Sequence, residues 1–342
     1  MKSKGLGCLI TFLVVALVFS VLFNFVGAAA LLGIGLEESQ FAYVQPKQRF
    51  SQVLEQNALN DSKDKIVQID MEGIIASGSA GQLFSSGGMS VDGVRRALEQ
   101  ATKDGAVRAI VLKVNSPGGE VTASDTLYHA VKQAAKIKPV VVYMDSMAAS
   151  GGYYLACGAT KIVANETTLT GSIGVIIQTL NYSQTFDKVG LQTLTFASGA
   201  FKDSLSGSRP MRDDEKAYIQ NLVTQMYDKF LGIVSQARGI DTETLKNGIA
   251  DGRVLTGKEA LEKKLVDKVG YIEDAYALAK ELSSSANAMV VRYQHTPSFG
   301  DILGVLGESQ ASKGTLKIDV SERLLPRLEA GRMYLLPSHM IP

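Results

Sequence analysis

The sequence predicts an α/β fold, built as a largely parallel sheet or as stacked ββα units, behind an N-terminal transmembrane helix. Two observations carry this prediction. Runs of β-branched and apolar residues alternate with runs at helical spacing across residues 63–285, which is typical of parallel sheets. The chain also begins with an uncharged apolar stretch. Its 342 residues are 46% hydrophobic, so a sizeable core can be buried.

The apolar stretch, residues 5–36, carries no charged side chain. A membrane-spanning helix needs roughly 20 apolar residues, and this stretch exceeds that length. Lysines precede it and glutamates follow it, so we expect the N-terminus in the cytoplasm and the rest of the chain outside. A cleaved signal peptide is the alternative, because alanines occupy positions 28–30. Its apolar core is usually about 7–15 residues long, so we expect an uncleaved, single-pass anchor within residues 1–36.

The remainder of the chain divides into a linker at residues 37–62, the α/β domain at 63–285, and a strand with an apolar tail at 286–342. Within this remainder, alternating or apolar runs predict strands at 65–75, 107–115, 139–144, 161–165, 174–180, 191–196 and 289–293. Helical spacing predicts helices at 90–104, 122–137 and 213–238, and two more within 252–282.

Composition and motifs exclude several functional classes. The net charge is +1 with acidic and basic residues interleaved, which argues against a nucleic-acid-binding face. The sequence holds no phosphate-binding loop, no dinucleotide fingerprint and no zinc-like spacing of cysteine and histidine. We therefore expect no nucleic acid partner, no cofactor and no metal ion. The two cysteines predict no disulfide framework, because Cys8 lies in the apolar N-terminal stretch and Cys157 in the domain.

One serine stands where a predicted strand turns into a helix. In SMAASGGYYLA, residues 146–156, Ser150 follows the apolar run KPVVVYM and precedes Gly151 and Gly152. Binding groups of parallel α/β folds collect where strands end and helices begin, and glycines let the backbone turn there. The ordinary role of such a serine is a helix N-cap, so its position alone does not identify a nucleophile.

A second turn of the same kind strengthens the functional interpretation. NSPGGE, residues 115–120, joins a predicted strand to a helix through Gly118 and Gly119. If the two strands are neighbours, N–H groups of both turns point at one place, which is how an oxyanion hole for acyl transfer is made. Gly-Gly pairs are also common in plain turns, so the strength of the signal lies in the match between the two.

A serine nucleophile needs a general base. The histidines are poorly placed, since His129 falls within a predicted helix and His295 and His339 lie in the C-terminal region; the G-x-S-x-G elbow is absent too. A lysine becomes a base only when burial or a nearby positive charge lowers its pKa. Lys202 lies among small and apolar residues in TFASGAFKDSLSGSRP. The alternative is a solvated Lys202, because lysine is rarely buried.

Taken together, these motifs resemble the signal peptide peptidase A (SppA-type) family of serine peptidases in its short, single-unit form. The matching segments are VNSPGGEV, SMAASGGYYLA, TGSIGVI, SGAFKDSLSGSRPM and DGRVLTGKEALEKKLVD, in the family's order, within residues 63–285. The resemblance implies a Clp-protease/crotonase-like fold of stacked ββα units. It also implies the site residues: Ser150 as nucleophile, Lys202 as general base, Ser172 orienting the lysine amine, and an oxyanion region at Gly118, Gly119 and Gly151.

The resemblance further implies an activity and a setting. The expected activity is that of a serine endopeptidase with a Ser-Lys dyad and no cofactor, which cleaves remnant signal peptides and other apolar peptides. The expected assembly is a homo-oligomeric ring, and whether the dyad forms within or between chains is open. With residues 5–36 in lipid, we expect the catalytic domain on the extracytoplasmic side of a bacterial cytoplasmic membrane.

Two other functions are compatible with the same fold. A crotonase-like acyl-CoA enzyme would use the same glycine turns with acidic residues near the acyl group, and Glu120 is the only carboxylate directly beside SPGG. A non-catalytic membrane scaffold would tolerate the loss of Ser150 or Lys202. The apolar tail, RMYLLP at 332–337, either packs on the domain or occupies the substrate groove of its own or a neighbouring subunit.

Overall fold

The computed structural model describes residues 17, 20, 50–77, 89–294 and 334–335. The chain divides into two units, Met1–Gln48 and Arg49–Pro342, and the second contains the sheet and helices described below. In the described part of the chain, no helix is both long enough and apolar enough to cross a membrane. The anchor predicted over residues 5–36 lies outside the described residues, apart from Leu17 and Ser20.

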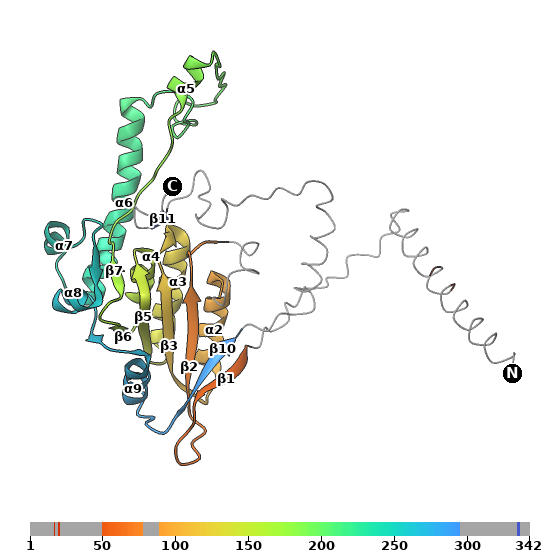
Figure 1. The fold of residues 1–342 in the computed structure, drawn as a ribbon, viewed down its shortest axis with the longest axis vertical. Coiled ribbons are helices and arrows are strands. Elements are labelled where there is room, and N and C mark those ends of the chain that lie inside the picture. Colours follow the sequence, from red (N-terminus) through yellow and green to blue (C-terminus); the bar gives the residue numbers. More distant parts are fainter. Residues whose placement is uncertain (1–16, 18–19, 21–49, 78–88, 295–333, 336–342) are drawn as a thin grey trace. The chain divides into compact units, whose positions relative to one another are not determined.

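Among the described residues, a nine-stranded sheet forms the centre of the second unit (Figure 1). Its main path runs β1 (Ser51–Gln56), β10 (Met289–Gln294), β2 (Lys65–Glu72), β3 (Val107–Ser116), β5 (Val140–Ala149), β6 (Lys161–Ala164) and β9 (Lys268–Val269). Beside β5, the sheet continues through β7 (Leu169–Gly171) and β8 (Val254–Thr256). All pairs are parallel except β1 with β10 and β7 with β8.

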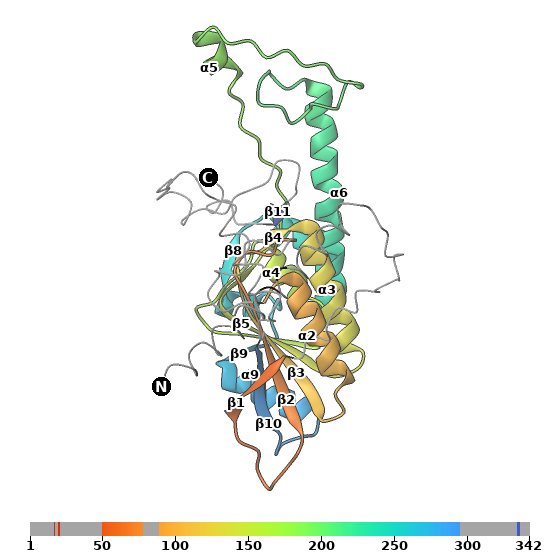
Figure 2. The ribbon, with the colours of Figure 1, turned by 90° about the vertical axis from the view of Figure 1, so that its right-hand side faces the viewer.

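Helices cover both faces of the sheet. Successive strand residues point to opposite sides, so these apolar strands present side chains to be buried on each face. Ile110 and Leu112 belong to the larger core, which also contains buried residues of α2 (Val91–Lys103), α3 (Val121–Ala135), α4 (Gly151–Ala156) and α6 (Asp213–Arg238). Val111 and Val141 belong to the opposite core, against α9 (Ile272–Leu282). Figure 2 shows α2 and α3 on one side of the strands and α9 on the other. The predicted α/β fold is confirmed.

Most predicted elements of this domain are confirmed, and local chemistry explains several of their ends. The helix predicted at 213–238 is α6, which ends because Gly239 adopts a φ of 65°. Ser90 caps α2 by accepting the N–H of Gly93 at 2.9 Å. The two helices predicted within 252–282 are α8 (Gly257–Glu262) and α9. The structure adds α7 (Thr242–Gly248), and the predicted linker contains β1.

Two predicted strands, at 174–180 and 191–196, are wrong. Residues 176–212, which we call the arm, leave the sheet, form α5 (Ser183–Lys188) and return to the start of α6. Figures 1 and 2 both show α5 and the beginning of α6 projecting away from the strands. The apolar side chains of the arm therefore have no sheet to join; Leu180, Leu194 and Phe196 are 79%, 80% and 95% exposed.

Hydrogen bonds between its outgoing and returning segments hold the arm together. The N–H of Tyr182 donates to the carbonyl of Gly207 at 2.8 Å, and the Thr179 hydroxyl donates to the carbonyl of Leu205 at 2.9 Å. A Cβ on Gly207 would lie 1.9 Å from the carbonyl oxygen of Leu180, so glycine is needed where the two segments meet. The arm is thus an ordered element of the single chain, although its apolar surface is uncovered.

Candidate active site

Ser150 lies at the junction where β5 ends and α4 begins. Its N–H donates to the carbonyl of Gly171, the last residue of β7, at 2.8 Å, and its carbonyl accepts the N–H of Tyr154 at 2.8 Å. Its φ of 53° and ψ of −113° are rarely adopted by residues other than glycine. Strained backbone of this kind is retained mostly where function requires it.

The hydroxyl of Ser150 has no hydrogen-bond partner among the described residues, although the residue is 1% exposed. Ser150 occupies the N-cap position of α4, but its side chain forms no capping hydrogen bond, so capping does not account for this hydroxyl. A buried polar atom without a partner costs free energy and is rare in folded proteins. The unpaired hydroxyl is therefore free to react with an incoming group.

The two glycine turns meet beside Ser150. β3, which leads into the first turn, pairs in parallel with β5, which leads into the second. A Cβ on Gly151 would lie 3.2 Å from the Cα of Gly118, 3.2 Å from the nitrogen of Gly119 and 2.4 Å from the Oγ of Ser124. Only glycine at position 151 lets the turns approach this closely. Nothing in the sequence pattern marks Ser124, because a buried serine on a helix is common.

The first turn is fixed by its own hydrogen bonds. Gly118 adopts a φ of 103°; its N–H donates to the Ser116 hydroxyl at 3.1 Å, and its carbonyl accepts the N–H of Ile75 at 2.9 Å. A Cβ on Gly119 would lie 2.0 Å from the carbonyl oxygen of Ile75. Of the three glycines predicted to form the oxyanion region, Gly118 thus uses its N–H within the turn. Ile75 was not identifiable from the sequence, since its contribution is made by its backbone.

Ser172 lies beside Ser150 at the ends of neighbouring parallel strands. Ala149 of β5 is paired with Gly171 of β7, so the two serines follow paired residues. Ser172 is buried, has a φ of 49°, and donates its N–H to the carbonyl of Arg253 at 2.8 Å. Both serines thus leave the sheet at the same level, and both have a positive φ.

The single chain does not bring Lys202 to this place. Lys202 lies on the arm between α5 and α6 and is exposed, and Figure 2 shows this part of the chain far from α4. Among the described residues, its side chain makes no hydrogen bond or ion pair. Within one chain, the residues near Lys202 in the sequence therefore do not bury its amine.

A strand from the C-terminal tail borders the first glycine turn. β11 (Tyr334–Leu335) pairs antiparallel with β4 (Gly119–Glu120), with Tyr334 opposite Glu120 and Leu335 opposite Gly119. Because Gly119 also faces Gly151, an extended backbone already lies along this edge of the site. The described part of the tail thus contacts the domain through its backbone.

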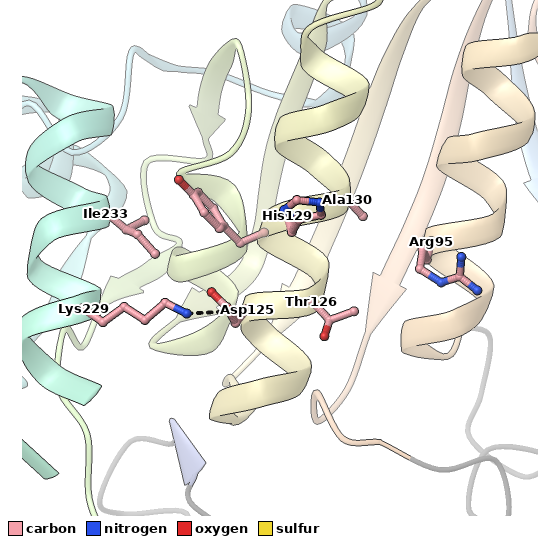
Figure 3. Close-up of a pocket in the computed structure, with 8 residues that line it drawn as sticks. Arg95, Asp125, Thr126, His129, Ala130, Lys229 and Ile233 are labelled. Atoms are coloured by element: carbon pink, nitrogen blue, oxygen red, sulfur yellow. Dashed lines mark ion pairs between the residues drawn. The ribbon is translucent and has the colours of Figure 1, made fainter. Parts of the chain in front are cut away.

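A hollow of about 600 Å³ lies elsewhere, between α2, α3 and α6 (Figure 3). It contains His129, the one histidine among the described residues, but neither Ser150 nor Lys202 lines it. Two of its charged groups pair with each other: Asp125 pairs with Lys229 at 2.8 Å, and it also accepts the Tyr154 hydroxyl at 2.7 Å. This hollow is therefore separate from the candidate site.

Neither Cys157 nor Tyr153, both on or next to α4, is suited to act as a nucleophile in place of Ser150. Burial raises the pKa of the Cys157 thiol to about 12, so the thiol stays protonated at neutral pH. Burial likewise raises the pKa of Tyr153, whose hydroxyl donates to the carbonyl of Leu265 at 2.9 Å. In the described part of the chain, no cluster of histidine, cysteine and carboxylates could hold a metal ion.

Several known proteins with similar sequences carry peptidase or protease names. The model of peptidase family S49 matches residues 132–286. A putative signal peptide peptidase SppA from Enterococcus faecium is 37% identical over 282 residues, which cover 81% of this chain and 80% of that protein. Protease 4 from Haemophilus influenzae is 33% identical over 223 residues, which cover 64% of this chain and 35% of that longer protein.

Among solved structures, a ClpP1 variant from Listeria monocytogenes aligns with a TM-score of 0.41 and 17% identity, covering 61% of this chain and 93% of that one. The sequence similarities carry the assignment, because the Enterococcus relative is matched over most of its own length. The chain belongs to peptidase family S49, as its resemblance to the signal peptide peptidase A family predicts, and it is a serine-type peptidase.

Proposed function

We propose that this protein is a membrane-anchored serine endopeptidase that hydrolyses remnant signal peptides and other apolar peptides with a Ser150–Lys202 dyad. The observation that carries the proposal is the state of Ser150. Its hydroxyl is buried and unpaired on a strained strand-to-helix turn, with the turn at Gly118 and Gly119 packed against it. This is the environment that an activated nucleophile needs.

In the proposed reaction, the neutral amine of Lys202 takes the proton of the Ser150 hydroxyl while Oγ attacks the substrate carbonyl. The resulting oxyanion accepts N–H groups of Gly119 and Gly151, which are better placed than Gly118 because the Gly118 N–H is already engaged. The lysine then protonates the leaving amine, and water releases the acyl group from Ser150. Ser172 orients the amine; its place beside Ser150 supports this role.

The substrate is proposed to bind as an extended strand along β4. The pairing of β11 with β4 supports this mode, since it demonstrates that the edge accepts an antiparallel backbone. The tail of the same chain is then a competitor for the groove as well as a packed segment. Backbone pairing gives affinity without strict sequence demand, which suits a peptidase for varied apolar peptides.

We further propose that Lys202 acts on Ser150 of a second copy of this chain in a homo-oligomeric ring. Two observations support a partner of this kind. The arm that carries Lys202 projects from the domain with apolar side chains uncovered, which is unusual for a surface that stays in water. Within the part of its own chain that the structure describes, no basic side chain hydrogen-bonds the Ser150 hydroxyl either. A second copy supplies both the missing amine and a surface for the arm.

Mixing two inactive variants tests the dyad and its arrangement together. Ser150→Ala and Lys202→Ala are each expected to hydrolyse an apolar reporter peptide at background rate. When the purified variants are dissociated, mixed equally and reassembled, about a quarter of the sites in a closed ring combine an intact serine with an intact lysine. Activity near that fraction is expected. No recovery, in mixtures whose exchange is verified by mass, contradicts a dyad between chains, and full activity of Lys202→Ala contradicts the dyad itself.

The anchor is a separate part of the proposal. The charge pattern around residues 5–36 supports a single span with the N-terminus in the cytoplasm and the peptidase domain on the other side. Protease added to spheroplasts should cut the peptidase domain. Removal of residues 1–36 should release the domain from the membrane fraction. No observation favours an acyl-CoA enzyme or a scaffold; the carboxylate of Glu120 already accepts the N–H of Ser77 at 3.0 Å.

A further inference from the structure

A guanidinium links the segment of Lys202 to the helix that follows it. Arg209 donates from Nε and Nη2 to both carboxylate oxygens of Asp203, at 3.0 and 2.8 Å. The same group donates from Nη1 and Nη2 to both oxygens of Glu215, at 2.9 and 2.5 Å. Bidentate hydrogen bonds of this kind fix the geometry of the pair as well as stabilising it. Here the Arg209 side chain makes two such bidentate contacts.

The Glu215 end of this link is buried in the first turn of α6. The Glu215 side chain is fully buried; it accepts the backbone N–H of Arg212 at 2.8 Å and pairs with the Arg212 guanidinium at 2.9 Å. Hydrogen bonding from Arg209 lowers the pKa of Glu215 to about 2, so the carboxylate is charged at any working pH. A buried charge with these partners is a rigid attachment point on a long helix.

The other end reaches the residues on both sides of Lys202. Asp203 follows it directly, and on the other side Arg212 donates to the carbonyl of Ala200 at 3.0 Å. The guanidinium of Arg212 lies 5.7 Å from the centre of the Phe201 ring, which in turn packs against Tyr218 of α6 at 5.3 Å. Ala200, Phe201 and Asp203 thus each contact Arg209 or Arg212. Lys202, which lies between them, contacts neither arginine.

We propose that Arg209 is a positioning residue of the peptidase reaction: by joining Asp203 to Glu215, it holds the backbone of Lys202 so that the free amine is presented at a fixed place. The inference rests on the proposed dyad. A lysine on an uncovered arm has a flexible stem, and anchoring its neighbours limits the positions that Nζ can reach. Positioning matters at this scale, because a displacement of 1 Å can cost about 100-fold in rate.

The test measures the rate at which a fluorophosphonate modifies Ser150 in the full-length protein. Arg209→Met removes the link, and Asp203→Asn removes only its end next to Lys202. Each is expected to slow modification about tenfold or more, with kcat for a reporter peptide falling and KM little changed. In a Lys202→Ala background neither substitution should slow modification further, because both act through the lysine.

A matched control lies at the opposite end of α6. Arg238 pairs with Asp267 at 3.0 Å and its side chain is 12% exposed, so Arg238→Met removes a comparable ion pair from the same helix. This control should lower thermal stability without changing the modification rate. Asp203→Asn keeps the inference testable if Arg209→Met fails to fold, since the buried Glu215 then keeps its partner.

Three outcomes overturn the inference. In the first, Arg209→Met and Asp203→Asn both react at the wild-type rate. In the second, both slow the reaction by the same factor whether or not Lys202 is present. In the third, Lys202→Ala itself reacts at the wild-type rate. The last result refutes the proposed dyad as well, whereas the first two leave the dyad intact and reject only the positioning role of Arg209.

Discussion

The backbone of Ser150 predicts an unusual order of stabilities, in which two inactive variants are more stable than the native protein. Ser150→Ala removes a buried hydroxyl that has no partner among the described residues. Ser150→Gly removes the hydroxyl and also the Cβ that makes a φ of 53° with a ψ of −113° unfavourable. We expect stability to rise from the native protein to Ser150→Ala and again to Ser150→Gly.

The size of each step follows from the local geometry. Burying an unpaired polar group costs about 1–3 kcal/mol, and lost contacts of the oxygen offset part of this, so the first step is about 1 kcal/mol. Backbone strain of this kind costs about 1–3 kcal/mol. Two costs offset part of the gain from relieving this strain. The unfolded-chain entropy of glycine costs about 0.5–1 kcal/mol, and the loss of a buried methyl group costs about 0.8 kcal/mol. If the strain lies near the top of its range, the second step is also about 1 kcal/mol.

Thermal unfolding of the full-length protein, dissociated into single chains so that no Lys202 of a second copy reaches Ser150, measures these steps. For a domain of this size, 1 kcal/mol corresponds to about 2–4 °C in Tm, so Ser150→Gly should unfold about 4–8 °C above the native protein. Ser124→Ala is the matched control, because its buried hydroxyl does have a partner, the carbonyl of Glu120 at 2.9 Å. This control should be less stable than the native protein. A Ser150→Gly variant that unfolds below Ser150→Ala would refute the strain at the nucleophile.

Three further predictions concern Gly151, Glu215 and Cys157. Gly151→Ala should cost about 1–3 kcal/mol in a urea titration and abolish peptidase activity, because its Cβ would lie 2.4 Å from the Oγ of Ser124; added Ser124→Ala should restore part of the stability, and a Gly151→Ala variant of native stability would contradict the packing. Since the pKa of Glu215 is lowered to about 2, its stabilising effect is complete above the unfolded value of about 4.3 and is lost as pH falls from there toward 2. Urea midpoints between pH 5 and 2.5 should therefore fall less steeply in Glu215→Gln, and equal slopes would count against this pair. With its pKa raised to about 12, Cys157 should resist iodoacetamide at pH 8 until the protein is unfolded, and mass spectrometry of the Cys157 peptide would detect any modification of the folded protein.

Local sequence signals were sufficient for the strand-to-helix turns at the site. The runs before Ser150 and Gly118 are apolar and β-branched, and the glycines that follow them leave the backbone few other ways to turn. The helix at 213–238 was equally predictable, because its periodicity is long and Gly239 ends it. Each of these elements depends on contacts that are close in the sequence.

The arm and the first strand depend on distant contacts, so the sequence pattern misled there. Residues 191–196 have the composition of a strand, yet no neighbouring strand is available to pair with them. β1 has the opposite character: four of its six residues are polar and five are exposed, and it forms a strand because β10 offers an edge. The link from Asp203 through Arg209 to Glu215 was hidden for the same reason, since charged residues near a helix start usually remain in solvent.

The most direct test of the Ser150–Lys202 mechanism is to locate the fluorophosphonate adduct by mass spectrometry in the native protein, in Lys202→Arg and in Lys188→Ala, a control on the same arm. Arginine keeps the charge but cannot act as a base. We predict a single adduct on Ser150 in the native protein and in Lys188→Ala, and none above background in Lys202→Arg. An adduct on another serine, or equal modification of Ser150 in Lys202→Arg, would contradict the mechanism.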